Sequence, residues 1–177
     1  MKRLGIVVVV CSLFAVGCES TTENPVSPSN QVILAAQMSG SQEVPLASAP
    51  EANGVGTVQI VMTPAAGGAY SATFSFSIAG LVRAGVLPAP LDSGSVIVAG
   101  HIHRAPAGVA GPVVVPLPIS QAAPLVSPTG SVVVSFSNVT VNADIASAIL
   151  ADPAGYYINL HSALNPAGVV RGQLVRQ

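Results

Sequence analysis

The chain is short of charge, of aromatic side chains and of thiols. Charged residues make up 7% of its 177 residues, where an ordinary soluble domain has about 25%, and tryptophan is absent. Beyond residue 17 there are four arginines and no lysine against seven acidic residues. This balance excludes a nucleic-acid-binding domain, because such domains need a dense set of basic side chains to neutralise phosphates. With so few polar groups, the candidates for binding a metal or moving a proton are few as well.

The amino terminus has the pattern of a lipoprotein signal. Two basic residues precede an apolar stretch that is too short to span a membrane as a mature helix. The stretch ends in Ala15-Val16-Gly17-Cys18, which resembles the bacterial lipobox, a motif of small residues before a cysteine that becomes lipidated. We therefore expect residues 1–17 to be a signal peptide and Cys18 to be the lipidated first residue of the mature protein. The alternative is an ordinary secretory signal with an incidental cysteine.

This anchor also predicts the location of the protein and its domain organisation. We expect a cell-envelope lipoprotein that is held in a membrane through its lipid and faces the periplasm or the exterior. Residues 18–30 are polar and rich in proline and serine, which is typical of a flexible tether, and residues 31–177 suffice for one β domain with its own core. Since Cys11 leaves with the signal and Cys18 carries lipid, this domain has neither a disulfide nor a cysteine metal ligand.

Hydrophobic alternation predicts an all-β domain. From Tyr70 to Ile78 apolar residues alternate with serine and threonine, and Val132 to Ser137 repeats the pattern, as expected of half-buried strands. Glycine and proline separate these segments, as in the turn expected from Pro124 to Gly130. The further expected strands are Val32–Met38, Val55–Met62, Ser95–His103, Pro112–Leu117, Tyr156–His161 and Val169–Val175.

One short helix is expected from Asn142 to Ala151, with Asn142 as its cap and Asp152-Pro153 as its end. Seven to eight short strands with turn signals between them favour an antiparallel β-sandwich or a Greek-key barrel. A parallel α/β fold is excluded, because one short helix cannot provide the repeated crossovers that connect parallel strands.

All three histidines lie in two of the predicted strands. His101 and His103 flank Ile102, and because side chains alternate along a strand the two imidazoles project from one face. This is the geometry of a chelating pair, and His161 from a neighbouring strand would complete a three-nitrogen site for copper or zinc. The alternative is that the histidines only hydrogen-bond to carbonyl groups of the glycine- and proline-rich loops nearby.

Four other polar residues are candidates for the surroundings of this site. Asn159 is expected either to orient an imidazole or to brace a turn. Glu43 is expected to form a buried ion pair with Arg104 or Arg171, since a lone charge in so apolar a domain must be neutralised. Arg171 is also expected at the rim of the site, where it would attract an anion to an open metal position. No catalytic residue is assigned, because the sequence contains neither a nucleophile elbow nor a phosphate-binding P-loop.

Three stretches of the chain resemble the CHRD domain family, which is named for chordin. They are Met38–Pro45, Gly100–Val115 and Tyr156–Leu174, and together they extend the resemblance over Gln31–Val175. All three histidines lie in the second and third stretches. The resemblance implies an extracellular β-rich module, and by itself it does not imply an activity.

A weaker resemblance relates His101, His103, His161 and Arg171 to the copper half of Cu/Zn superoxide dismutases, which are also antiparallel β-barrels. The chain lacks the histidine that bridges to zinc, the histidines of a zinc site and the disulfide, so dismutase activity is not implied. Two hypotheses follow. The one we favour is a lipid-anchored binding or structural module without enzymatic activity, whose protein partner the sequence does not identify. The alternative is a copper- or zinc-binding redox protein.

Overall fold

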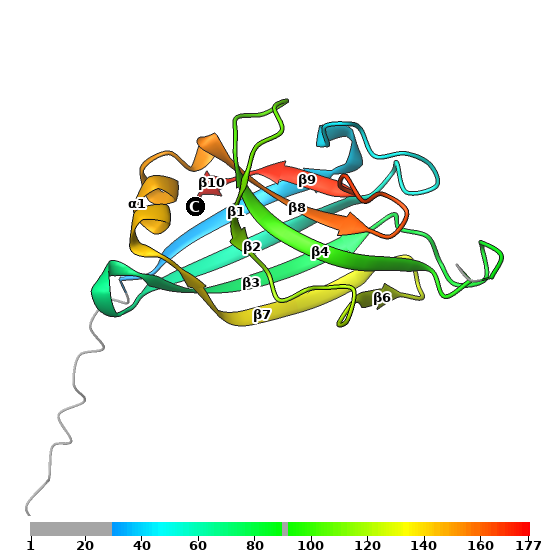
Figure 1. Ribbon diagram of the computed structural model, residues 1–177, viewed down its shortest axis with the longest axis horizontal. Coiled ribbons are helices and arrows are strands. Elements are labelled where there is room, and N and C mark those ends of the chain that lie inside the picture. The colour runs from blue at the N-terminus through cyan, green and yellow to red at the C-terminus, as the bar shows by residue number, and fades with distance from the viewer. Residues whose placement is uncertain (1–29, 90–91) are drawn as a thin grey trace, which may run out of the picture.

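The computed structural model describes residues 30–89 and 92–177 (Figure 1). The expected signal peptide, Cys18 and the tether up to residue 29 lie outside the described residues. Within the described part of the chain, no helix is long and apolar enough to cross a membrane.

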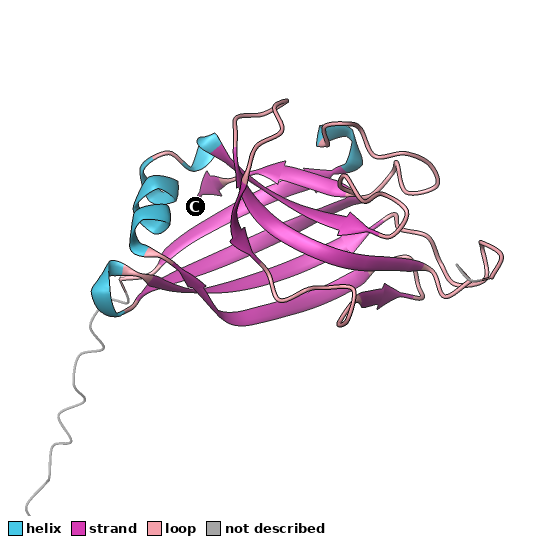
Figure 2. Ribbon diagram, viewed as in Figure 1, coloured by secondary structure: helices cyan, strands magenta, loops and turns pink. Residues whose placement is uncertain are grey.

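Antiparallel strands make up most of the domain, as predicted (Figure 2). Eight of them form one continuous sheet in the order β5-β4-β8-β9-β1-β2-β3-β7, which curls into a nearly closed barrel, while β6 pairs with β4 and β10 with β1 at its margins. The strands are β1 (Val32–Ser39), β2 (Val55–Pro64), β3 (Tyr70–Ala79), β4 (Ser95–Arg104), β5 (Val113–Pro116), β6 (Leu125–Ser127), β7 (Val132–Val141), β8 (Tyr156–Ser162), β9 (Val170–Gln173) and β10 (Val175–Arg176).

The all-β fold class is confirmed, and a barrel describes it better than a sandwich because a single sheet carries the strands. The pairs β3–β7, β4–β8 and β1–β9 join segments far apart in sequence, as in Greek-key barrels. Two strand predictions were wrong in detail. β6 lies where a turn was predicted, because three residues are too few to show alternation. The last predicted strand is divided at Leu174, which is fully buried between β9 and β10.

One hydrophobic core fills the interior of the barrel. Phe74, Phe76 and Ile78 of β3 are buried in it, whereas Ser75 and Ser77 between them are exposed. Strand alternation therefore assigns one face of the sheet to the core and the other to solvent and loops.

The helix α1 (Ala143–Ala151) packs against one end of the barrel and contributes Ala146 and Ile149 to the core. Asn142 lies at its N-cap position, but its side chain does not form the expected cap hydrogen bond. Its backbone oxygen accepts a hydrogen bond from the Ala146 amide. The shorter helices are η1 (Gly40–Gln42), η2 (Ala66–Gly68) and η3 (Pro153–Gly155).

Replacing Phe76 with alanine is expected to lower the free energy of unfolding by about 3–5 kcal/mol, because it empties part of a close-packed core. The neighbouring Ser75→Ala variant is the matched control, with an expected change within ~0.5 kcal/mol at an exposed position. Denaturant unfolding measures both. Equal losses in the two variants would show that the faces of β3 are assigned wrongly.

Candidate metal centre

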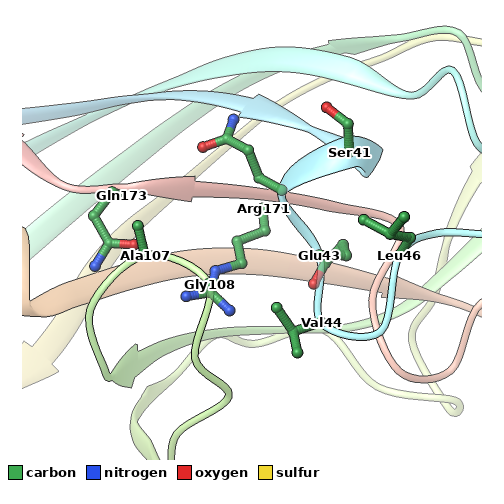
Figure 3. Close-up of a pocket in the computed structure, with 9 residues that line it drawn as sticks. Ser41, Glu43, Val44, Leu46, Ala107, Gly108, Arg171 and Gln173 are labelled. Carbon is green, nitrogen blue, oxygen red and sulfur yellow. The ribbon is translucent and has the colours of Figure 1, made fainter.

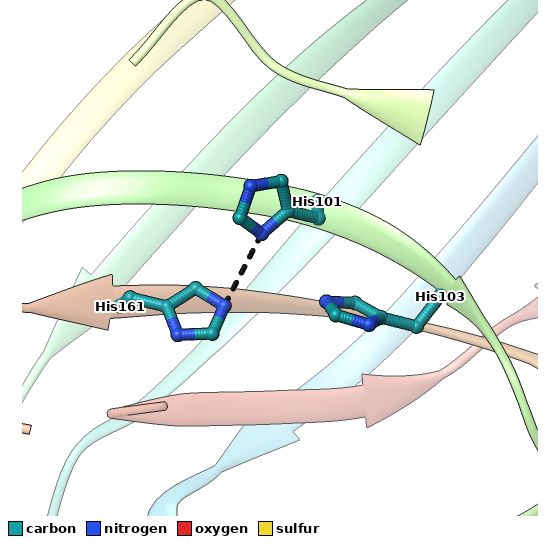
Figure 4. A group of neighbouring side chains, drawn as sticks. All are labelled: His101, His103 and His161. Carbon is teal, nitrogen blue, oxygen red and sulfur yellow. Dashed lines mark hydrogen bonds between the residues drawn. The ribbon is translucent and has the colours of Figure 1, made fainter. Parts of the chain in front are cut away.

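The three histidines lie on the outer wall of the barrel, on β4 and β8 (Figure 4). Ile102 of β4 and Ile158 and Leu160 of β8 are buried in the core, so the residues alternating with them project outward. Hydrophobic burial of these three side chains therefore determines that His101, His103 and His161 share the outer face.

The register between β4 and β8 brings the histidines together. His101 lies opposite Asn159, and Ala99 lies opposite His161, so His161 is the diagonal neighbour of His101 across the strand pair. The ring centroids of His101 and His161 are 5.1 Å apart, and those of His101 and His103 are 5.4 Å apart. The sequence alone predicts the pair on β4, whereas the approach of His161 depends on the register.

The nitrogen atoms are close enough to share one ion. His101 Nδ1 lies 3.2 Å from His161 Nε2, and one nitrogen from each of the three rings lies within 4.8 Å of the others. A metal bound at about 2.0–2.1 Å to three imidazoles in tetrahedral geometry holds their nitrogens roughly 3.4 Å apart. His101 and His161 already meet this spacing, and binding by all three rings requires the widest pair of nitrogens to close from at most 4.8 Å.

Backbone carbonyl groups set the tautomers of two rings. His103 Nδ1 is 2.8 Å from the Gly111 oxygen, and His161 Nδ1 is 2.9 Å from the Pro166 oxygen. A carbonyl oxygen only accepts hydrogen bonds, so both Nδ1 atoms donate, and Nε2 of His103 keeps its lone pair. In His161 a neutral ring that donates through Nδ1 has an unprotonated Nε2, which accepts from His101 Nδ1 and cannot donate to the Asn159 Oδ1 oxygen nearby. The Nε2 atom of His103 is buried and has no hydrogen-bond partner. This arrangement is typical of metal-binding histidines, whose second nitrogen is usually held by a carbonyl or carboxylate group.

All three imidazoles have lowered pKa values. The pKa of His101 falls to about 4, mainly through burial and then through the neighbouring His161 and His103. Burial is also the largest cause of the lowered pKa of His103 and His161, and it outweighs their hydrogen bonds to carbonyl groups, which act in the opposite direction. The rings are therefore neutral near pH 7, and neutral imidazole is the form that binds metal.

Tyr157 separates the histidines from Arg171. The His103 ring stacks on Tyr157 with the planes 4° apart and the centroids at 4.7 Å, and the Arg171 guanidinium carbon lies 3.4 Å from the centre of the same ring. The two groups must lie on opposite faces, because one face has no room for both. Arg171, expected at the rim of the histidine site, is therefore next to it but behind Tyr157. Tyr157 itself was not among the expected site residues, although it shares a strand face with Asn159 and His161.

The loop between β4 and β5 covers this part of the wall. Arg171 donates a 3.0 Å hydrogen bond to the Pro106 oxygen, and Gln173 donates one of 2.7 Å to the Ala105 oxygen. The Gly111 amide donates to the Tyr157 hydroxyl at 3.3 Å. The polar side chains of β8 and β9 therefore bind the loop through its backbone.

Asn159 lies between the histidine cluster and Glu43. It is buried, its Oδ1 oxygen lies 3.1 Å from His161 Nε2, and its hydrogen bond to Glu43 lowers the pKa of that carboxyl. Asn159 is therefore adjacent to the imidazole of His161, whose Nδ1 atom is held by the Pro166 carbonyl group.

Glu43 does not have the ion pair expected for it. Only 2% of its surface is exposed and Oε1 has no hydrogen-bond partner, yet neither Arg171 nor Arg104 forms an ion pair with it in the described part of the chain. The stack on Tyr157 and the bond to Pro106 engage Arg171 instead, and Arg104 is exposed at the end of β4. Burial raises the pKa of Glu43 to about 7, and the nearby Asn159 amide and Arg171 charge only partly oppose this.

A Glu43→Gln variant is expected to gain stability over the wild type as the pH rises. Because the pKa of Glu43 is 4.5 in the unfolded chain and about 7 in the folded one, the wild type loses stability between these values. The gain of the variant is expected to reach at most about 3.5 kcal/mol above pH 7, since one pKa unit corresponds to about 1.4 kcal/mol. Urea unfolding of both proteins from about pH 4 to pH 8 measures the difference. The histidines titrate in both proteins, so a pH-independent difference would contradict the raised pKa.

Comparison with known proteins gives one match. The family model for the CHRD domain matches residues 34–174. No match was found among curated proteins or among solved structures. The matched segment runs from β1 to the end of β9 and contains all three histidines, Tyr157 and Arg171. The chain therefore belongs to the CHRD domain family.

Proposed function

We propose that this protein is a lipid-anchored, extracytoplasmic CHRD module that binds one copper or zinc ion through His101, His103 and His161. Membership of the CHRD family supports an extracytoplasmic binding or structural module. The observation that carries the metal site is the convergence of three imidazole nitrogens within 4.8 Å on the outer wall of the barrel.

Bracing of the β4–β5 loop does not account for this convergence. The bracing contact of His103 uses Nδ1 and leaves Nε2 buried without a partner, which costs free energy unless another group binds there. The side chain of His101 contacts no loop carbonyl and hydrogen-bonds only to His161. A cation at the centre of the cluster gives each of these nitrogens a partner.

The donor set favours copper or zinc. Three neutral imidazoles suit both ions, and copper(II) binds more tightly than zinc to a given nitrogen site. No cysteine or carboxylate belongs to the cluster, so at least one metal position is left for water or another small ligand. The redox alternative requires copper, because zinc has no redox chemistry.

The purified wild-type protein is expected to bind one equivalent of copper(II), and one of zinc more weakly, in a calorimetric titration checked by elemental analysis. His103→Ala is expected to lower the copper affinity by more than about 100-fold, since even the loss of a group that only orients a ligand costs about 10–100-fold. Arg104→Gln is the matched control, because Arg104 is exposed and its side chain contacts none of the histidines. Absence of metal uptake by the wild type, or equal uptake by His103→Ala, would refute the metal site.

The anchor is supported by the sequence, since Cys18 lies outside the described residues. Small residues precede Cys18, and a polar, proline- and serine-rich segment follows it before β1 begins at Val32. Several acyl chains on one cysteine hold a protein to a membrane far more firmly than a single chain does.

Replacing Cys18 with serine is expected to move the protein from the membrane fraction to the soluble fraction, because serine cannot accept the thioether-linked lipid. Fractionation followed by mass spectrometry of the amino-terminal peptide measures this, and a Ser20→Ala variant is the control. A Cys18→Ser protein that is cleaved normally and still sediments with membranes would refute the lipid anchor.

A further inference from the structure

A pocket of about 260 Å³ is lined by Arg171 (Figure 3). The guanidinium of Arg171 stacks on Tyr157, so the pocket lies near that stack. Its walls come from the segment after β1, which contributes Glu43, Val44 and Leu46, from the β4–β5 loop at Gly108, and from Arg171 on β9. None of the three histidines lines it. The pocket is therefore separate from the candidate metal centre.

Arg171 supplies unused hydrogen-bond donors to this pocket. Its side chain is only 2% exposed, and of the five donors of a guanidinium one hydrogen bond is formed, to the Pro106 oxygen. Tyr157 covers one flat face of the guanidinium, and the donors that are not bonded to Pro106 lie along its edges. Such edges match the two oxygens of a carboxylate.

Glu43 provides a hydrogen-bond acceptor beside the donors of Arg171. Its Oε1 atom is buried without a hydrogen-bond donor, although a guanidinium lines the same pocket. A buried carboxyl group and a buried guanidinium ordinarily pair with each other. A molecule that accepts from Arg171 and donates to the carboxyl group of Glu43 would pair with both, and it must reach a carboxyl group that is only 2% exposed.

The mouth of the pocket combines apolar and polar side chains. Val44 is 37% exposed and Leu46 is 69% exposed, and the exposed Ser41 and Gln42 line the pocket beside them. At about 260 Å³ the pocket is slightly smaller than the roughly 300–1,000 Å³ typical of sites for drug-sized ligands. It therefore fits a small molecule with a polar end and a short apolar side chain.

We propose that this pocket binds a carboxylate that has a hydrogen-bond donor on the adjacent carbon and an apolar side chain, the chemistry of a free α-amino acid or of a peptide carboxyl terminus. The carboxylate binds to Arg171, the donor faces Glu43, and the side chain packs on Val44 and Leu46. Metal binding at the histidines is not required.

Four related probes test this arrangement by calorimetry on the metal-free protein, where no metal can chelate them. Leucine and N-acetyl-leucine carry the carboxylate, the donor and the side chain, whereas leucinamide lacks the carboxylate and 4-methylpentanoate lacks the donor. Binding of the first two at least about tenfold tighter than the last two is expected, because each deletion leaves a buried group unpaired. Tighter binding of leucine identifies the free amino acid as the ligand, and equal or tighter binding of N-acetyl-leucine identifies a chain terminus. Failure of both to bind, or equal binding of leucinamide or 4-methylpentanoate, would overturn the proposal.

Two variants test whether the ligand binds in this pocket. Arg171→Lys keeps the charge but loses the two-pronged contact, so at least about a tenfold loss of affinity is expected. Leu46→Asp alters an exposed side chain, which leaves the fold intact, and is expected to weaken binding several-fold by repelling the carboxylate. Arg104→Gln is the matched control and is expected to bind as the wild type does. Wild-type affinity in Leu46→Asp, or the absence of NMR shifts at the Gly108 and Leu46 amides on addition of leucine, would contradict the assignment.

Discussion

The antiparallel register of β4 with β8 determines which side chains meet on the outer wall of the barrel. It is held by burial of Ile102 and Ile158, which lie opposite each other and contribute about 1.5–3 kcal/mol each. A slip of one residue would turn these isoleucines outward and the histidines into the core. Burial of these apolar side chains therefore fixes the positions of the three histidines on the outer wall.

In the described part of the chain the polar side chains of this wall form no ion pair, and backbone atoms of the adjoining loops are their hydrogen-bond partners. Gly111 accepts from His103 and donates to Tyr157, and a side chain at position 111 would collide with the Arg104 carbonyl. Gly168 has a φ of 141°, and a Cβ there would collide with the Glu43 carboxyl group. Glycine at these two positions therefore allows the loops to approach the polar residues closely, which a chain with 7% charged residues needs because few countercharges are available.

Local patterns predicted much of the fold and the placement of two histidines on one strand face. Alternation is a property of one strand, so it identified the faces of β3 and the shared face of His101 and His103. The approach of His161 needs the register of strands 60 residues apart in sequence, which no local pattern contains. The pairing of Glu43 was predicted from charge alone, and it was wrong because a stacked aromatic ring competes with a carboxylate for the guanidinium of Arg171.

Because the Tyr157 ring lies between them, Arg171 does not contact His103, and its positive charge acts on the histidines only through space. That charge lowers the pKa of His103 and so favours the neutral imidazole that binds metal, but it also repels an arriving cation. The carboxyl group of Glu43 is the nearby countercharge, and its pKa of about 7 means that it balances Arg171 only when deprotonated. Deprotonation of Glu43 therefore opposes this repulsion, while burial is the largest cause of the lowered imidazole pKa values. The carboxyl group of Glu43 therefore influences the histidine cluster through space, and it does so only when it is negatively charged. An ion pair with Arg171 would instead favour the negative form and lower the pKa of Glu43.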